Sequence, residues 1–110
     1  PKEMVEVINM DSFLISLLGN YGEAGFIKNI MPSFYRRHTA GIWSGKMKES
    51  KSISKILTYK KLEEFYKQDN DLSMVRHFTS LIKNINKSLF LIYLKKNQPL
   101  KAFRLLKTIL

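Results

Sequence analysis

The chain has 110 residues, of which 45% are hydrophobic, and a net charge of +10. This predicts one folded domain with a modest core rather than a disordered polymer. There is no cysteine, which excludes a disulfide framework and a thiolate metal site. The longest purely apolar run is Leu89–Leu94, far short of the roughly 20 residues that a membrane-spanning helix needs.

The positive charge is distributed unevenly along the chain. Residues 1–45 hold four Lys/Arg and four Asp/Glu, whereas residues 46–110 hold fifteen Lys/Arg and five Asp/Glu. The asymmetry predicts two functional regions, 1–45 and 46–110. The second region is a candidate to meet an anionic surface.

The first predicted helix begins near Asp11. Residues 1–9 show no clear period and are expected to be irregular or extended. Asp11 stands where an N-cap or first-turn residue would stand, and Gly19 and Gly22 are expected to end the helix. Its apolar residues form one stripe at helical spacing, made by Phe13, Leu14, Leu17 and Leu18.

A small β-hairpin is expected next. GFIKNI, residues 25–30, reads as a short strand, and SFYRRH, residues 33–38, reads as its partner. A period of two would place Arg36 and His38 side by side on one face of the second strand. TAGIWSG, residues 39–45, is expected to be a loop.

The remainder of the chain is predicted to be helical. Apolar periodicity indicates one helix over about 46–67 and a longer one over about 72–95. The intervening QDND, residues 68–71, reads as a connector with capping residues. Pro99 suits the first position of a last helix, after Asn97 as its cap.

Asp11 is open to two interpretations. It can be the N-cap of the first helix, since Asp is strongly preferred there. It can also be a general base, held at a helix start where backbone N–H groups position its carboxylate. Nothing local in the sequence decides between the two.

The stretch from Ser33 to Gly45 concentrates groups that carry chemistry. The guanidinium of Arg36 and the imidazole of His38 suit a diphosphate or a metal–phosphate complex, although a solvated strand end is the alternative. Trp43 can stack on a sugar or a base, or it can fill a core.

The lysines of residues 46–110 are interpreted first as the solvated faces of helices. An anionic membrane surface is a second option. Nucleic acid is a third, but no recognition helix or aromatic platform accompanies the charge, so this partner is disfavoured.

As a whole, residues 11–45 resemble the end of the catalytic domain of bacterial family 2 glycosyltransferases of the GT-A type. Those enzymes carry an Asp after an acidic residue, a Leu-rich helix, a "YG", a short strand and a "P..YR.H..G.WS" continuation. The chain departs from this pattern at Met10, where an acidic residue is usual. The matching positions are Asp11, Leu14–Leu18, Tyr21–Gly22, Phe26–Ile30, Pro32, Tyr35–Arg36, His38, Gly41, Trp43 and Ser44.

The resemblance implies transfer of a sugar from a nucleotide-sugar donor to an acceptor hydroxyl, with inversion, in cell-surface polysaccharide or glycan synthesis. Asp11 matches the family's catalytic base. Arg36 and His38 match residues near the donor diphosphate and its divalent metal, Mg or Mn, with His38 a candidate metal ligand. Trp43 and Ser44 would lie in the loop that closes over the site.

The fold class that the resemblance implies is mainly α with a small β-hairpin. Residues 1–45 would be the end of a GT-A α/β catalytic domain, and residues 46–110 its basic helical tail. The nucleotide-binding half and its DxD motif are expected upstream. Asp69-Asn70-Asp71 matches the DxD pattern, but it is interpreted as a connector and cap because it lies between two predicted helices.

Several further expectations follow from the resemblance. The isolated 110 residues should bind no metal and show no transferase activity, and the first helix and hairpin should expose apolar surface or self-associate. The location would be cytoplasmic, with the tail free to contact a membrane or a partner subunit. The rival functions are a basic helical module for nucleic acid and a tail that docks on anionic lipid; neither explains the residues clustered between 35 and 44.

Overall fold

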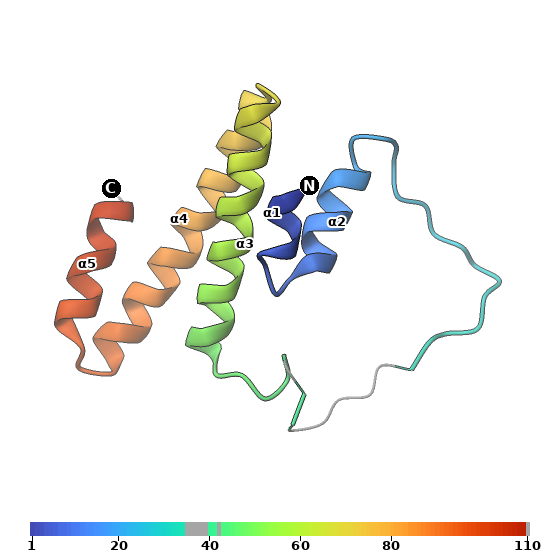
Figure 1. The fold of residues 1–110 in the computed structure, drawn as a ribbon. Coiled ribbons are helices and arrows are strands. Elements are labelled where there is room, and N and C mark those ends of the chain that lie inside the picture. The colour runs from blue at the N-terminus through green and yellow to red at the C-terminus, as the bar shows by residue number, and fades with distance from the viewer. Residues whose placement is uncertain (35–39, 42, 110) are drawn as a thin grey trace.

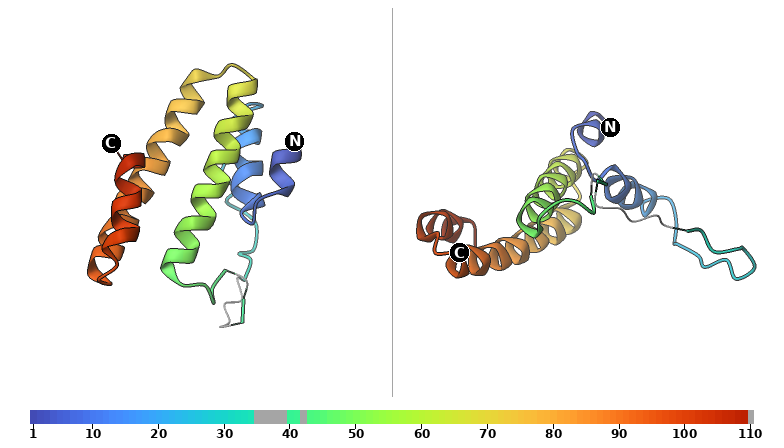
Figure 2. Two further views of the ribbon diagram at one scale, coloured as in Figure 1. Left: turned by 60° about the vertical axis from the view of Figure 1, so that its left-hand side comes forward. Right: turned by 90° about the horizontal axis from the view of Figure 1, so that it is seen from below.

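The computed structural model describes residues 1–34, 40–41 and 43–109. Within these residues the chain forms α-helices and no β-strand. The long helices α3 and α4 lie antiparallel, α5 folds back along α4, and α1 and α2 pack against α3 on the side away from α5 (Figures 1 and 2). The elements in chain order are α1 Lys2–Val5, α2 Met10–Leu18, α3 Lys48–Gln68, α4 Leu72–Lys95 and α5 Pro99–Ile109.

The predicted helices of the second half are confirmed, with α3 and α4 ending within two residues of the predicted bounds. The connector between them also has the predicted role. The Asp71 carboxylate accepts a hydrogen bond from the Met74 N–H at 3.0 Å and so caps α4. Asn70 takes a positive φ of 57°, a conformation that Asn tolerates better than most residues.

The last helix begins at Pro99 as predicted, where the missing N–H of proline costs no helical hydrogen bond. Asn97 was expected to cap this helix, and that expectation is wrong. Its φ is 54°, and it belongs to the turn that ends α4. There, the N–H of Asn97 bonds to the Leu94 carbonyl and the N–H of Gln98 bonds to the Tyr93 carbonyl.

The N-terminal region departs further from the sequence expectations. Residues 2–5, expected to be irregular or extended, form the short helix α1. The helix predicted from Asp11 is present as α2 and ends at Gly19, as expected. The helical stripe of α2 is only partly used, because Phe13 is completely buried while Leu14 and Leu18 remain exposed.

The predicted β-hairpin, and with it the mixed fold class, is wrong. Residues 25–30 form no strand, and residues 20–34 run as an open segment away from the helices (Figure 1). Most of the second predicted strand, residues 35–38, lies outside the described residues. Isolated strands are unstable without a partner strand and a surface to pack on, and the side chain of Phe26 is 88% exposed. The described chain is therefore all-α, without the α/β sheet of a GT-A domain.

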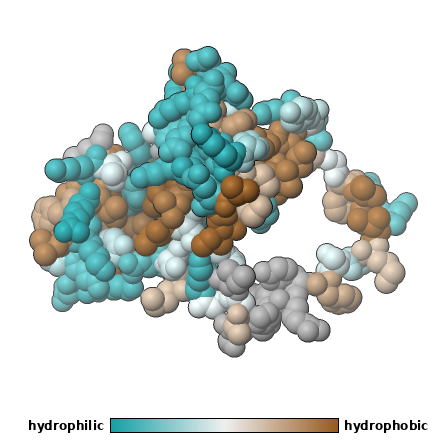
Figure 3. Space-filling model, in the orientation of Figure 1, coloured by the Kyte–Doolittle hydropathy of each residue, from teal (hydrophilic) through white to brown (hydrophobic). Residues whose placement is uncertain are grey.

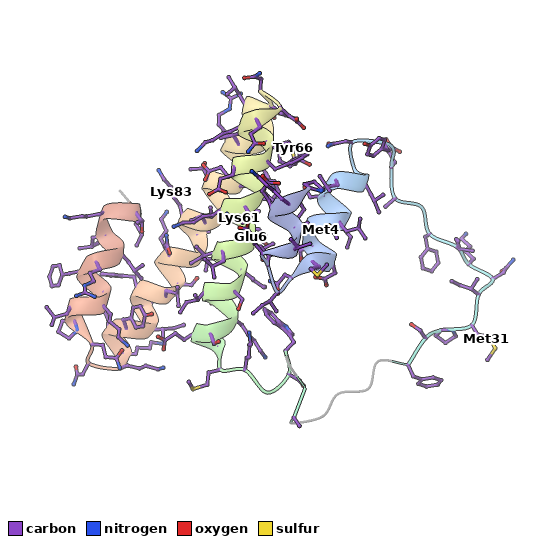
Figure 4. All side chains as sticks on the ribbon, in the orientation of Figure 1. Met4, Glu6, Met31, Lys61, Tyr66 and Lys83 are labelled. Atoms are coloured by element: carbon purple, nitrogen blue, oxygen red, sulfur yellow. The ribbon has the colours of Figure 1, made fainter. Side chains whose placement is uncertain are left out.

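One core joins α1 and α2 to the α3–α4 pair. It contains Val7, Phe13, Leu62, Tyr66 and Phe78. The Tyr66 ring stacks on Phe78 at a centroid distance of 5.9 Å, and its hydroxyl donates to the Ser16 carbonyl at 3.0 Å. At the rim, Lys61 and Glu6 point toward each other and form an ion pair of 2.7 Å (Figure 4).

A second core joins α4 to α5 and contains Leu89, Tyr93 and Ala102. Ala102 is completely buried, and its small side chain lets the two helices approach closely. The Tyr93 hydroxyl donates to Glu49 Oε1 at 2.9 Å and links the end of α4 to the start of α3. Burial and this hydrogen bond both raise the pKa of Tyr93.

Candidate functional site

Asp11 is the second residue of α2 and lies in its first turn. Its carboxylate accepts the N–H of the adjacent Ser12 at 2.8 Å. The N-cap position belongs to Asn9, whose side chain makes no capping bond. Asp11 therefore does not serve as the N-cap, and its exposed carboxylate is available to the solvent.

Trp43 lies in the turn that leads into α3. Within this turn the N–H of Lys46 bonds to the Trp43 carbonyl at 3.2 Å, and the N–H of Gly45 bonds to the Gly41 carbonyl at 3.0 Å. The Lys51 ammonium lies 5.9 Å from the centroid of the indole ring, a distance at which the cation is attracted to the π-face. The indole is thus held against the first turn of α3.

Asp11 and Trp43 line the same cavity, although they lie 32 positions apart in the sequence. The cavity has a volume of about 480 Å³, within the usual range for a small-molecule site. The start of α2 forms one wall, the turn before α3 a second, and Lys55 of α3 contributes a cation. The remaining lining residues are Ile8, Asn9, Met10 and Ser12.

The other predicted site residues are placed less fully. Ser44 is half-buried beside Trp43 in the turn and is not among the residues that line the cavity. Arg36 and His38, predicted to bind the donor diphosphate, lie outside the described residues, as does Tyr35 of the same motif. Their roles stay predictions.

Lys55 is the cavity residue that the sequence reasoning missed. It was interpreted as one of many solvated lysines, because nothing in its own neighbourhood distinguishes it. A signal was nevertheless present, since Lys51 and Lys55 are four residues apart and so share a face of α3. That face points to the turn that carries Trp43.

The described residues do not by themselves build a divalent metal site. No group of three His, Asp or Glu side chains is gathered in the part of the chain that the structure describes. Asp11 is the only carboxylate among the cavity residues named above. Mg²⁺ bound to proteins commonly takes one or two carboxylates together with substrate phosphates and water, so Asp11 alone leaves the coordination incomplete.

A large apolar surface adjoins the cavity, on the outer face of α2 and along residues 21–34. Figure 3 shows brown atoms over α2 and, apart from the helical body, along the open segment, and Met31 points outward from this segment in Figure 4. Phe34 is 98% exposed. The exposed apolar residues of this surface are Leu14, Ile15, Leu18, Tyr21, Phe26, Ile27, Ile30, Met31 and Phe34.

Comparison of the chain with protein-family models, with curated proteins and with solved structures found no match. Among the described residues, no helix combines the length and the apolar character needed to cross a membrane.

Proposed function

We propose that the chain is the C-terminal portion of a nucleotide-sugar-dependent glycosyltransferase, and that the cavity between Asp11 and Trp43 belongs to the acceptor side of its active site. The observation that carries this proposal is the meeting of these two residues in one cavity. Both were singled out from the sequence for sugar transfer, one as the base and the other as part of the loop closing over the site.

In this proposal Asp11 and Trp43 have separate tasks in the cavity. The exposed Asp11 carboxylate takes the proton from the attacking acceptor hydroxyl. The N–H of Ser12 holds one of its oxygens at 2.8 Å, which leaves the other oxygen free to face the acceptor. The Trp43 indole offers a flat apolar face on which a sugar ring can stack.

Lys55 supplies positive charge to the same cavity. A nucleoside diphosphate leaves with growing negative charge, which nearby cations stabilise. Arg36 and His38 are the residues that we expect to do so most directly, and a divalent metal that His38 would help to hold would supply further positive charge. Lys55 would add to the electrostatic potential without contacting the reacting atoms.

The exposed apolar surface supports the proposal that these residues form only part of an active site. Exposed apolar surface on this scale often marks contact with another protein surface. In the proposal, the outer face of α2 and residues 21–34 pack on the nucleotide-binding portion of the enzyme, which lies in additional polypeptide. The 110 residues alone therefore turn over no nucleotide-sugar.

The proposal is tested by Asp11→Asn in the longer enzyme. The amide has nearly the same shape as the carboxylate but cannot accept the proton, so kcat should fall at least about 100-fold. The dissociation constant for the nucleotide-sugar donor should change less than threefold, because Asp11 serves the acceptor. Both quantities are measured on the same preparation, by turnover and by calorimetric titration.

Asp71→Asn is the matched control. Asp71 also stands at a helix start, but its carboxylate caps α4 and does not line the cavity. Asn is also a good N-cap, so this variant should retain normal kcat. Full turnover by Asp11→Asn, or an equal loss in both variants, would remove Asp11 from the role of base.

A further inference from the structure

A second cavity, which shares no lining residue with the Asp11 cavity, lies in the groove that α5 leaves between itself and α3. Its volume is about 400 Å³. We call it the α3–α5 groove. Helix α4 forms its floor, and α3 and α5 form its walls (Figure 2). It is lined by Ile53, Ile56, Leu57, Lys60, Glu63, Thr79, Ile82, Lys83, Asn86, Leu89, Tyr93, Leu105 and Thr108.

The groove is apolar along most of its length. The α4 residues that line it run from Thr79 to Tyr93, a rise of about 21 Å at 1.5 Å per residue. Isoleucine and leucine side chains from all three helices contribute to its surface. Because Leu57 is 56% exposed, part of the apolar surface of the groove is open to solvent.

Positive charge gathers toward one end of the groove. Lys60 of α3 and Lys83 of α4 both line it, and Figure 4 shows Lys83 extending from α4 on the side where α5 lies. Neither ammonium forms an ion pair with a carboxylate of the described chain. Two unpaired cations beside an apolar groove favour an anionic group there.

The nearby carboxylate does not cancel this charge. Glu63 lines the same end of the groove, but its Oε1 accepts a hydrogen bond from the Thr79 hydroxyl at 2.7 Å. The same oxygen lies 3.6 Å from the Lys67 ammonium. Glu63 is therefore already engaged. At the opposite end, Glu49 is occupied by Tyr93 and Lys96.

We infer that the α3–α5 groove binds a single-chain anionic amphiphile, with the hydrocarbon chain along the groove and a phosphate or carboxylate head between Lys60 and Lys83. The volume of about 400 Å³ lies within the usual range for a small-molecule site. This inference concerns residues outside the Asp11 cavity and does not depend on the proposed function.

The polar groups of the groove fit such a ligand. The side chains of Asn86 and Thr108 are hydrogen-bonded to each other at 3.0 Å, Asn86 donating. This bond satisfies one N–H of Asn86 and gives the Thr108 oxygen a partner, so fewer polar groups are left unpaired beside a hydrocarbon chain. The head group meets the lysines, whose flexible stems can follow phosphate or carboxylate oxygens.

The test uses the ¹⁵N-labelled 110-residue chain and three probes, followed by backbone amide chemical shifts. Dodecyl phosphate, below its micelle concentration, carries both the chain and the anionic head. Dodecyl maltoside carries the same chain with a neutral head, and inorganic phosphate carries the head alone. We expect saturable shifts at Ile82, Asn86 and Leu105 with dodecyl phosphate, at least tenfold weaker binding of dodecyl maltoside, and weaker binding still of inorganic phosphate.

Charge-reversal variants then locate the head group. The double variant Lys60→Glu/Lys83→Glu should lower the affinity for dodecyl phosphate at least tenfold and leave that for dodecyl maltoside within twofold. Lys87→Glu/Lys107→Glu is the control, because both lysines are exposed and outside the groove. If the first variant loses helical circular dichroism, Lys60→Gln/Lys83→Gln replaces it.

A further variant tests the hydrocarbon chain. Leu57→Asp places a carboxylate on the exposed wall of the groove and should weaken dodecyl phosphate and dodecyl maltoside alike. The inference is overturned if the shifts fall on residues 20–34 instead of the groove, if the lysine reversals leave the affinity for dodecyl phosphate unchanged, or if inorganic phosphate binds as tightly as dodecyl phosphate.

Discussion

Helices α3–α5 and residues 1–34 differ in where their apolar side chains go. In α3–α5, the apolar stripes meet one another and form a core that includes Leu89, Tyr93 and Ala102. In the N-terminal region, Phe13 reaches a core, whereas the outer face of α2 and residues 21–34 expose theirs. Helices α3–α5 also leave some apolar side chains exposed, among them Leu100 and Phe103. The proposed function assigns the exposed apolar surface of residues 1–34 to contact with further protein.

The largest expected difference between the regions is in the cost of deleting an apolar side chain. Leu89→Ala should lower the free energy of unfolding by about 2–5 kcal/mol, because it leaves a cavity between α4 and its neighbours. Phe26→Ala should change it by less than about 0.5 kcal/mol, since that ring is 88% exposed. Urea unfolding of both variants measures the contrast. A similar loss in both would mean that residues 21–34 pack on the helices.

A second contrast compares two aspartates at helix starts. Asp71→Ala should lower the free energy of unfolding by about 1 kcal/mol, because the N–H of Met74 loses its capping acceptor. Asp11→Ala should lower it by less than about 0.5 kcal/mol, because Asp11 caps nothing beyond the N–H of Ser12. Thermal or urea unfolding compares the two. An equal loss of unfolding free energy in both variants would show that Asp11 has a structural role.

A third experiment examines how α2 is attached to α3. Tyr66→Phe removes the hydroxyl that donates to the Ser16 carbonyl and should cost about 1 kcal/mol. Because the bond joins α2 to α3, amide hydrogen exchange in α2 should accelerate more than exchange in α4. Equal acceleration in both helices would show that α2 and the α3–α4 pair unfold as one unit.

The smallest expected effect concerns the ion pair between Glu6 and Lys61. The hydrogen bond and the charge of Lys61 lower the pKa of Glu6, so the stabilisation is present at neutral pH and is lost as the pH falls below about 4. Hydrogen bonds that Lys61 donates to Glu6 and Glu64 raise the pKa of Lys61, so its part is lost only as the pH rises above about 10. Because Glu6 is exposed and Lys61 is only partly buried, the effect should be small.

Glu6→Gln measures this effect. The melting temperature of the variant should lie slightly below that of the parent at pH 7, and this gap should narrow as the pH falls to 3. A gap that persists undiminished at pH 3 would show that Glu6 stabilises α1 by packing or by neutral hydrogen bonds instead of by charge.

The sequence predicted the helices of the second half well because their determinants are local. Each of these determinants acts on residues close to it in the sequence. They are the apolar periods of α3 and α4, the cap Asp71 and the N1 proline Pro99. The β-hairpin failed for the opposite reason. Phe26, Ile27 and Ile30 favour a strand, but a strand also needs a partner and a surface, which lie beyond any local window.

The candidate site shows the same division. The position of Asp11 in the first turn of α2 was predicted from its neighbours. Its approach to Trp43 was suggested only by the resemblance to glycosyltransferases, because spacing alone cannot bring residues 32 apart together. Lys55 was missed because its place in the cavity depends on how α3 packs beside α2 and not on its own neighbours.

The most direct test of the whole account is amide hydrogen exchange on the 110 residues alone and within the longer glycosyltransferase that the proposed function requires. We predict that the outer face of α2 and residues 21–34 gain at least 100-fold protection in the longer enzyme, while α4 and α5 exchange at unchanged rates. Equal exchange of residues 21–34 in the two proteins would contradict the account, because their apolar side chains would then remain exposed in the intact molecule.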